Sequence, residues 1–189
     1  MTHPAEKLYY TPDEYLARED AAEYKSEYYR GQIFAMAGTA VNHNRITGNL
    51  YIKFNQAFAG KNCEAFMSEV KAWSEAEQFF CYPDLLIICG NPAFYHKRND
   101  IITNPLIVIE VLSDSTRDFD RGNKFNFYRS IPTLREYILI DQYRIHVEQY
   151  SLNENGEWMT AEYRAADDIL QFSSVDFQIK ISELYERVK

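Results

Sequence analysis

Apolar and polar positions follow two different patterns along this chain, and each pattern predicts one kind of element. Two stretches are almost continuously apolar, "LLIIC" at residues 85–89 and "PLIVIEVL" at residues 105–112. Runs of this kind are typical of strands that helices cover on both faces. The pattern predicts three strands in the middle of the chain, over residues 63–75, 79–90 and 104–113.

Other segments carry apolar residues at helical spacing. Gly60 is expected to end a long helix whose apolar stripe repeats every four residues and consists of Ile46, Leu50, Phe54 and Phe58. A second helix is predicted over residues 117–131. A short helix is predicted to follow Thr11, because Thr11 and Glu14 have the spacing of a capping box.

The remaining elements are expected to be hairpins and short strands. One hairpin is predicted around Arg30 and Gly31, and a second is predicted to turn at Gln142 and Tyr143. Weak strands over 158–165 and 175–181 precede a short terminal helix. The order predicts an α/β fold with a central mixed sheet flanked by helices and an N-terminal helix/hairpin extension, in a single domain over residues 1–189.

The facing stripes of the long helix and the central strands are expected to form the core. Almost complete burial is predicted for Ile46, Leu50, Phe54, Ile87, Ile107, Val108 and Ile109.

Composition narrows the class of protein. The chain has 189 residues, of which 46% are apolar and 15% aromatic, as in a globular domain. It has no apolar run long enough for a membrane span, and its start lacks the pattern of a secretory signal. Cys63, Cys81 and Cys89 are odd in number, so free thiols and a cytoplasmic location are expected, with no structural zinc site.

The formal net charge of −8 argues against a protein that coats nucleic acid with basic surface. An enzyme with a local basic cleft remains compatible with this charge.

Two carboxylates occupy unusual positions. Glu110 lies inside the apolar run 105–112, and Asp84 follows Pro83 at the start of the run 85–89. An unpaired buried carboxylate is unfavourable, but a divalent cation such as Mg²⁺ removes the repulsion between two of them. The alternative is that Asp84 caps a turn while Glu110 meets a buried basic residue. A glycosidase carboxylate pair is a weaker option.

These residues carry a resemblance to a known family. Pro83-Asp84 followed by Glu110-Val111-Leu112 resembles the PD-(D/E)XK nuclease signature, and residues 20–150 resemble the Uma-type family of putative restriction endonucleases. The resemblance implies a restriction-endonuclease-like fold and metal-dependent hydrolysis of phosphodiester bonds. It also implies Asp84 and Glu110 as metal ligands, with Mg²⁺ or Mn²⁺ as the cofactor.

The chain departs from the superfamily pattern at one position. A lysine is expected two residues after the glutamate, where this chain has Leu112. The resemblance makes Lys124 the candidate for the missing catalytic ammonium. Asp120 and Tyr128 lie four residues before and after it, on the same helical stripe. The alternative is that Lys124 is a solvated helix residue that pairs with Asp120.

Further residues are candidates with open roles. His43 matches a family histidine and could bind metal or phosphate, or simply cap the long helix. Glu27 matches a recurrent family acid and could be a metal ligand or the partner of a basic residue. Glu69 and Lys71 are expected on one strand face, which makes Lys71 a rival to Lys124.

The implied reaction is endonucleolytic cleavage of nucleic acid, with DNA as the expected substrate and a homodimer as the expected assembly. Phosphate contacts are expected from Arg45, Arg117 and Arg121. Two alternatives stay open. The chain could be a non-catalytic nuclease-fold module that homo-oligomerises, which Leu112 and the acidic charge favour, or a phosphohydrolase of small nucleotides.

Overall fold

The computed structural model describes residues 9–36, 38–114 and 116–189. Residues 1–8, on which the expected absence of a secretory signal partly rests, lie outside the described residues. The helical segments are α1 (Pro12–Glu19), α2 (Val41–Phe58), α3 (Arg117–Phe119), the π-helix η1 (Asp120–Lys124), α4 (Phe125–Tyr128) and α5 (Ile181–Leu184). The strands are β1 (Ser26–Tyr29), β2 (Gln32–Ala35), β3 (Cys63–Met67), β4 (Lys71–Ser74), β5 (Phe79–Cys81), β6 (Leu85–Cys89), β7 (Ile101–Ile102), β8 (Ile107–Leu112), β9 (Glu136–Asp141), β10 (Val147–Leu152), β11 (Trp158–Tyr163), β12 (Ile169–Gln171) and β13 (Gln178–Lys180).

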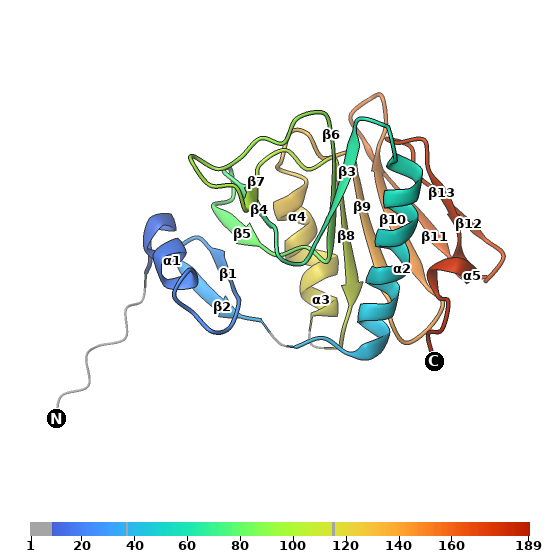
Figure 1. Ribbon diagram of the computed structural model, residues 1–189, viewed down its shortest axis with the longest axis horizontal. Coiled ribbons are helices and arrows are strands. Elements are labelled where there is room, and N and C mark those ends of the chain that lie inside the picture. The colour runs from blue at the N-terminus through green and yellow to red at the C-terminus, as the bar shows by residue number, and fades with distance from the viewer. Residues whose placement is uncertain (1–8, 37, 115) are drawn as a thin grey trace.

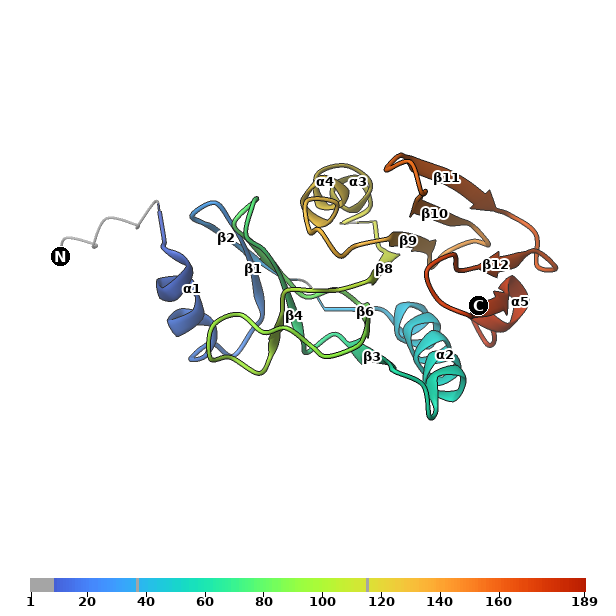
Figure 2. The same ribbon diagram turned by 90° about the horizontal axis from the view of Figure 1, so that it is seen from above.

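A mixed sheet forms the centre of the molecule, with the strand order β11-β10-β9-β8-β6-β3. Strand β8 runs parallel to β9 and antiparallel to β6. Helix α2 lies against one face of this sheet, and the α3–η1–α4 segment lies on the other face (Figures 1 and 2). The predicted α/β class and the central mixed sheet flanked by helices are confirmed.

The two faces of β8 separate two parts of the core. Ile107, Ile109 and Val111 pack with the apolar stripe of α2, whereas Val108 and Leu112 pack with α4. Every residue predicted to form the core is fully buried, with an exposed fraction of 0%. Glu110 belongs to the α4 face by strand alternation, so its carboxylate projects toward the helical segment that carries Lys124.

A second sheet carries the N-terminal extension, and its strand order is β2-β1-β5-β4-β7. Helix α1 has the predicted capping box: Glu14 N donates to Thr11 Oγ1, and Thr11 N donates to the Glu14 carboxylate. Tyr15 of α1 stacks on Tyr28 and Phe80, which fixes the helix against this sheet. The predicted hairpin at Arg30-Gly31 joins β1 to β2.

Two of the expected central strands are each divided between the two sheets. The segment 63–75 forms β3 and β4, separated by a turn in which Ser68 has a positive φ of 28°. The segment 79–90 forms β5 and β6, and the break falls at Tyr82-Pro83-Asp84. Proline has no backbone N–H for a ladder, so the chain leaves one sheet there and enters the other. The expectation of single strands was wrong at this point.

The second predicted helix is present but irregular. Its middle turn, Asp120–Lys124, is a π-helix between α3 and α4. π-Turns are rare and are frequently found at functional sites. This turn contains Lys124, and the side chain of Lys124 is buried.

The cysteines differ from the expectation. Cys63 and Cys89 are direct partners in the β3–β6 ladder and form a disulfide, so the prediction that they are free thiols was wrong. Only Cys81, which is buried, keeps a free thiol among the three. The cysteine argument therefore no longer supports the cytoplasmic prediction.

The C-terminal segment contains the predicted strands and helix, together with β12, which pairs with β13. The predicted hairpin at Gln142-Tyr143 joins β9 to β10. Across the described parts of the chain, no helix combines the length and the apolar character that a bilayer crossing requires.

Candidate active site

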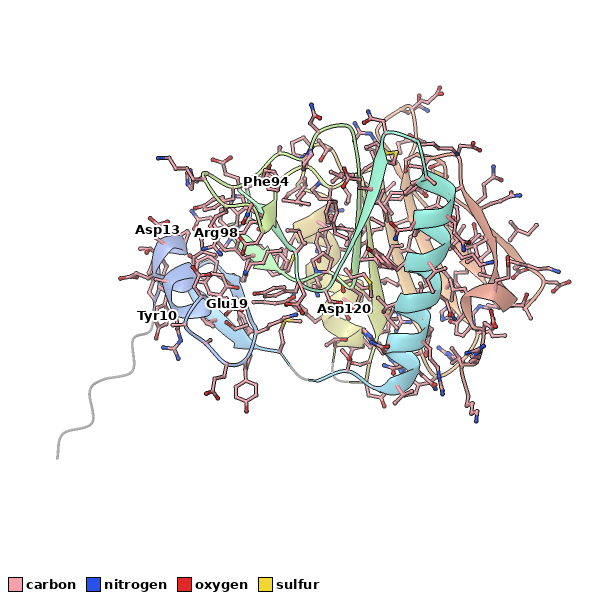
Figure 3. All side chains as sticks on the ribbon, in the orientation of Figure 1. Tyr10, Asp13, Glu19, Phe94, Arg98 and Asp120 are labelled. Atoms are coloured by element: carbon pink, nitrogen blue, oxygen red, sulfur yellow. A yellow bond between two sulfur atoms is a disulfide. The ribbon has the colours of Figure 1, made fainter. Side chains whose placement is uncertain are left out.

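A pocket of about 600 Å³ opens between the β1–β2 hairpin, the start of α2, the end of β8 and the η1 turn. Asp84, Glu110, Lys124 and His43 all line this pocket. Asp120, which also lines it, is labelled in Figure 3 between the N-terminal hairpin and α2. The structure therefore brings together the four residues predicted to be catalytic.

The Glu110 carboxylate has a defined partner on each oxygen. Tyr128 O–H donates to Oε1 at 2.7 Å, and Lys124 Nζ lies 3.0 Å from the same oxygen. The backbone N–H of Asp84 points at Oε2 with an N–O distance of 3.4 Å. Glu110 is only 3% exposed, so these contacts replace its hydration.

The Lys124 ammonium is surrounded by carboxylates. Besides Glu110, it lies 3.1 Å from Glu27 Oε1 and 3.5 Å from Asp120 Oδ1. Of the two roles open for Glu27, the geometry supports that of partner to a basic residue, because its carboxylate contacts the Lys124 ammonium. Lys124 is 5% exposed, which excludes the alternative of a solvated helix residue.

Asp84 is held by the main chain and by His43. Val111 N–H donates to Asp84 Oδ2 at 2.7 Å, and His43 Nε2 lies 3.0 Å from the same oxygen. His43 reaches Asp84 from the first turn of α2, and it is buried. Because Asp84 directly precedes β6 and Val111 lies in the neighbouring strand β8, this contact fixes the carboxylate beside Glu110.

Burial and neighbouring charges together shift the pKa values of the ionisable groups in the site. Burial raises the pKa of Glu110 well above its ordinary value; Lys124 opposes this shift, and the charges of Asp84, Asp120 and Glu27 add to it. Burial alone would lower the pKa of Lys124, but Glu110, Glu27 and Asp120 raise it well above its ordinary value. Lys124 therefore keeps its proton, and its single positive charge is shared by the three carboxylates around it.

Sequence comparison identifies the family. The family model described as "Putative restriction endonuclease" matches residues 12–182, which is most of the chain. The chain belongs to the Uma2 family. Two Synechocystis relatives are similar over most of their length, and both carry the description "uncharacterized protein". The first, sll1609, is 40% identical over 164 residues, covering 86% of this chain and 92% of the relative. The second, slr1290, is 34% identical over 175 residues, covering 93% and 90%.

A solved structure shares the fold. The crystal structure of a "putative nuclease belonging to DUF820" from Anabaena variabilis superposes with a TM-score of 0.74. The sequence identity is 19%, and the match covers 92% of this chain and 96% of that chain. At this identity the likeness shows that this Uma2 chain shares the fold of that protein.

The three arginines predicted to bind phosphate do not line the pocket of this Uma2 chain. Arg121 donates twice to Glu148, and Arg117 donates to Asp114 at 2.9 Å. Arg45 donates to Asn42 Oδ1 at 3.0 Å. Each guanidinium is thus engaged by a neighbouring side chain.

The rival lysine lies elsewhere. Lys71 begins β4 and pairs with Asp100 at 3.2 Å, and its ammonium lies over the ring of Tyr82. Glu69 lies in the preceding turn and pairs with Lys25 instead of sharing a strand face with Lys71. Neither residue lines the pocket, so geometry favours Lys124 over Lys71.

Two carboxylates of the pocket, those of Asp84 and Glu110, are possible ligands of a metal ion. Within the described residues, no group of three His, Cys, Asp or Glu side chains is arranged to hold an ion. Mg²⁺, however, commonly binds through one or two carboxylates and keeps several waters. Asp84 and Glu110 supply two carboxylates at one end of the pocket, and their chemistry fits such a hard cation.

Sequence reasoning missed the hydroxyl that fixes Glu110. Tyr128 was placed on the stripe with Asp120 and Lys124, but no role followed from that spacing. Tyr128 lies on the sheet-facing side of α4, and its pKa is raised well above the ordinary value by burial. A buried tyrosine hydroxyl needs a partner, so the stripe was the signal that could have identified it.

Proposed function

We propose that this chain is a Mg²⁺-dependent endonuclease that hydrolyses phosphodiester bonds of nucleic acid, with DNA as its substrate. The observation that carries the proposal is the meeting of two acids and one buried lysine in a single pocket. Glu110 Oε1 and Lys124 Nζ lie 3.0 Å apart, and Asp84 N–H points at Glu110 Oε2. Membership of a family described as restriction endonucleases supports the same reaction class.

In this proposal Asp84 and Glu110 hold the divalent cation, together with a main-chain carbonyl beside Glu110. When bound, the cation would lower the pKa of a water and offset charge on the phosphate. Mn²⁺ has the same ligand preferences and is the expected substitute.

The protein's own side chains orient the reactants. Lys124 stays protonated, and its N–H groups can donate to the attacking water or to a non-bridging phosphate oxygen. Glu27 and Asp120 also contact the ammonium. His43 acts on Asp84 and is a positioning residue, since its Nε2 lies against Asp84 Oδ2.

The geometry weakens one of the two arguments for the non-catalytic alternative. That alternative was favoured by the missing lysine at Leu112, but Lys124 brings an ammonium to the same carboxylate from the helical segment.

A homodimer remains part of the proposal, and light scattering in solution tests it.

The function is tested by plasmid nicking in Mg²⁺. We expect the wild-type chain to nick supercoiled plasmid, and we expect Asp84→Asn and Glu110→Gln to lose this activity while remaining folded. Asp118→Asn is the matched control, because Asp118 is an exposed acid on α3 that does not line the pocket. Wild-type protein without nicking in Mg²⁺ or Mn²⁺ would contradict the proposal.

Thermal melting tests the metal site without catalysis. At a Mg²⁺ concentration of about 100 times Kd, ligand binding should raise the melting temperature by about 5 °C or more. Glu110→Gln should abolish this rise. An equal rise in the variant would place the cation elsewhere.

A further inference from the structure

Two large aromatic side chains are exposed at the mouth of the pocket. Phe34 is 48% exposed and Tyr143 is 55% exposed, and both line the pocket. Met36, 37% exposed, lies beside Phe34 in sequence and also lines it. Most other aromatic rings of the chain are packed into the core, so this apolar rim around an acidic pocket needs an explanation.

The register of the hairpin sets the direction of Phe34. Phe34 of β2 is the direct cross-strand partner of Glu27 of β1. Directly opposed residues in an antiparallel pair share one face of the sheet. Since Glu27 reaches Lys124, Phe34 stands on the same side, toward the ammonium.

Tyr143 comes from a different element, the turn between β9 and β10. This turn is fixed to the end of β8 because Gln142 Nε2 donates to the Leu112 carbonyl at 3.0 Å. Tyr143 N–H donates to Asp141 Oδ1 at 2.9 Å, which shapes the turn further. The Arg117 guanidinium lies 5.9 Å from the ring centroid. The ring is thus held in place at the pocket mouth although more than half of it is exposed.

The charge of the pocket argues against a duplex backbone as the main binding determinant. Among the described residues that line it, five are acidic, and Lys124 is the only lysine or arginine. The acids are Glu27, Asp84, Glu110, Asp114 and Asp120. Duplex binding draws most of its affinity from lysine and arginine contacts to phosphates, and the three candidate arginines are paired with other side chains.

The burial of Glu110 and Lys124 also argues against a duplex as the substrate. Glu110 is 3% exposed and Lys124 is 5% exposed, so the scissile phosphate must enter the pocket to reach them. The pocket volume of about 600 Å³ is that of a small-molecule site. Enzymes whose target atom is out of reach inside a duplex act on single-stranded substrate or on an extruded nucleotide, and the depth of this pocket favours the same kind of substrate.

From these observations we infer that the pocket takes a single-stranded or locally unpaired stretch of nucleic acid, whose bases stack on Phe34 and Tyr143. The inference deepens the proposed nuclease function and rests on it for the identity of the ligand. Stacking on aromatic side chains tolerates every base, since every base has a π-face. It therefore supplies affinity where this pocket supplies little positive charge.

Binding of fluorescein-labelled oligonucleotides, followed by anisotropy, tests the inference. The full chain is used in EDTA, and Glu110→Gln is used in Mg²⁺, so that neither cleaves the probe. We expect a 12-nucleotide poly-dT strand to bind at least about tenfold more tightly than a duplex of equal length. Phe34→Ala and Tyr143→Ala should each weaken single-strand binding by about tenfold, the loss expected for one stacked base.

Two variants serve as controls. Tyr143→Phe keeps the ring and should restore most of the single-strand binding that Tyr143→Ala loses. Tyr24→Ala removes a tyrosine that is 80% exposed but does not line the pocket, and it should change nothing. Circular dichroism of each variant establishes that it is folded.

Three outcomes would overturn the inference. The first is a duplex that binds as tightly as the single strand. The second is unchanged binding in both Phe34→Ala and Tyr143→Ala. The third is competition by dTMP at the same nucleotide concentration as effective as that of the strand, which would favour a phosphohydrolase of small nucleotides. Single-strand binding without any cleavage would instead leave the stacking intact and contradict the nuclease proposal.

Discussion

Lys124 Nζ lies 3.0 Å from Glu110 Oε1, although the end of β8, helix α3 and most of η1 lie between the two residues in the sequence. The position two residues after Glu110 belongs to Leu112, which is buried among apolar side chains. An ammonium therefore reaches the carboxylate from the helical segment packed across the sheet. The position of the lysine in the folded structure, and not its position in a linear motif, decides whether its ammonium contacts the Glu110 carboxylate.

Removing the Lys124 charge should destabilise the fold. Lys124→Met leaves Glu27, Glu110 and Asp120 buried without their shared cation, and breaking a buried ion pair from one side typically costs about 3–5 kcal/mol. We expect the free energy of unfolding at pH 7 to fall by about 3 kcal/mol in urea denaturation. Lys97→Met, at an exposed lysine, should change it by less than about 0.5 kcal/mol.

A second variant separates charge from packing. In Lys124→Met combined with Glu27→Gln, one uncompensated carboxylate is removed, so the double variant should be more stable than Lys124→Met alone. Equal stability of Lys124→Met and Lys97→Met would contradict the buried ion cluster.

The disulfide predicts the number of reactive thiols. The chain has three cysteines, and one bridge joins Cys63 to Cys89. Unfolded protein without reductant should therefore release one equivalent of chromophore from Ellman's reagent, and reduced protein three. Native protein should react slowly, because burial raises the pKa of the Cys81 thiol.

The same bridge should contribute to stability. Closing a loop with a sequence separation of 26 is worth about 3.5 kcal/mol in the chain-entropy account. Cys63→Ser combined with Cys89→Ser should lower the free energy of unfolding by about 2–4 kcal/mol. Three reactive thiols in unreduced, unfolded protein would show that the bridge does not form.

The sequence allowed prediction of whatever depends on one residue and its near neighbours. The apolar stripe of α2 and the apolar runs around Ile87 and Ile109 predicted burial. An apolar side chain favours burial whichever segment its helix or strand packs against. The capping box of α1 is equally local, since Thr11 and Glu14 are three residues apart. These predictions were confirmed for that reason.

Pairings between distant segments were beyond this reasoning. The bridge between Cys63 and Cys89 depends on the β3–β6 register, which no local pattern specifies. The division of 79–90 between two sheets depends on where the second sheet lies, although Pro83 marked the break. In the site, Asp84, Glu110 and Lys124 were found through motif resemblance, whereas the engagement of Arg121 by Glu148 depends on tertiary packing.

Asp100 should make stability depend on acidic pH. The hydrogen bonds from Arg98 lower the pKa of Asp100 to about 2, and Lys71 acts in the same direction. A carboxylate whose pKa is lowered on folding stabilises the protein above its unfolded pKa of about 3.9, and this contribution is lost as the pH falls toward 2. About one-third exposure screens the interaction, which leaves about 1 kcal/mol.

Urea denaturation of Asp100→Asn checks this dependence. The variant should be about 1 kcal/mol less stable than the wild-type chain at pH 7, and the difference should shrink as the pH falls toward 2, where about half of the folded-state carboxylate is protonated. A difference that stays constant from pH 7 to pH 2 would assign the effect to packing.

Tyr128 should tune the metal site without touching the substrate. Its hydroxyl donates to Glu110 Oε1 at 2.7 Å, while its ring packs against Phe79 and Tyr137. Tyr128→Phe keeps the ring and deletes the donor, so Glu110 gains freedom to leave the orientation that faces Asp84. The free energy of unfolding should fall by about 1.5–3 kcal/mol, the usual value for a hydrogen bond to a charged group.

The decisive measurement for Tyr128 is Mg²⁺ affinity by calorimetric titration. Outer hydrogen-bond partners of metal ligands typically contribute about 10- to 100-fold to affinity, and we expect a loss at the lower end, because Lys124 still contacts Glu110. Tyr150→Phe is the matched control, since its hydroxyl donates to Glu148, which does not line the pocket. If Tyr128→Phe binds Mg²⁺ as tightly as Tyr150→Phe, the hydroxyl serves only to satisfy a buried carboxylate, and Glu110 is oriented by Lys124 and the Asp84 N–H alone.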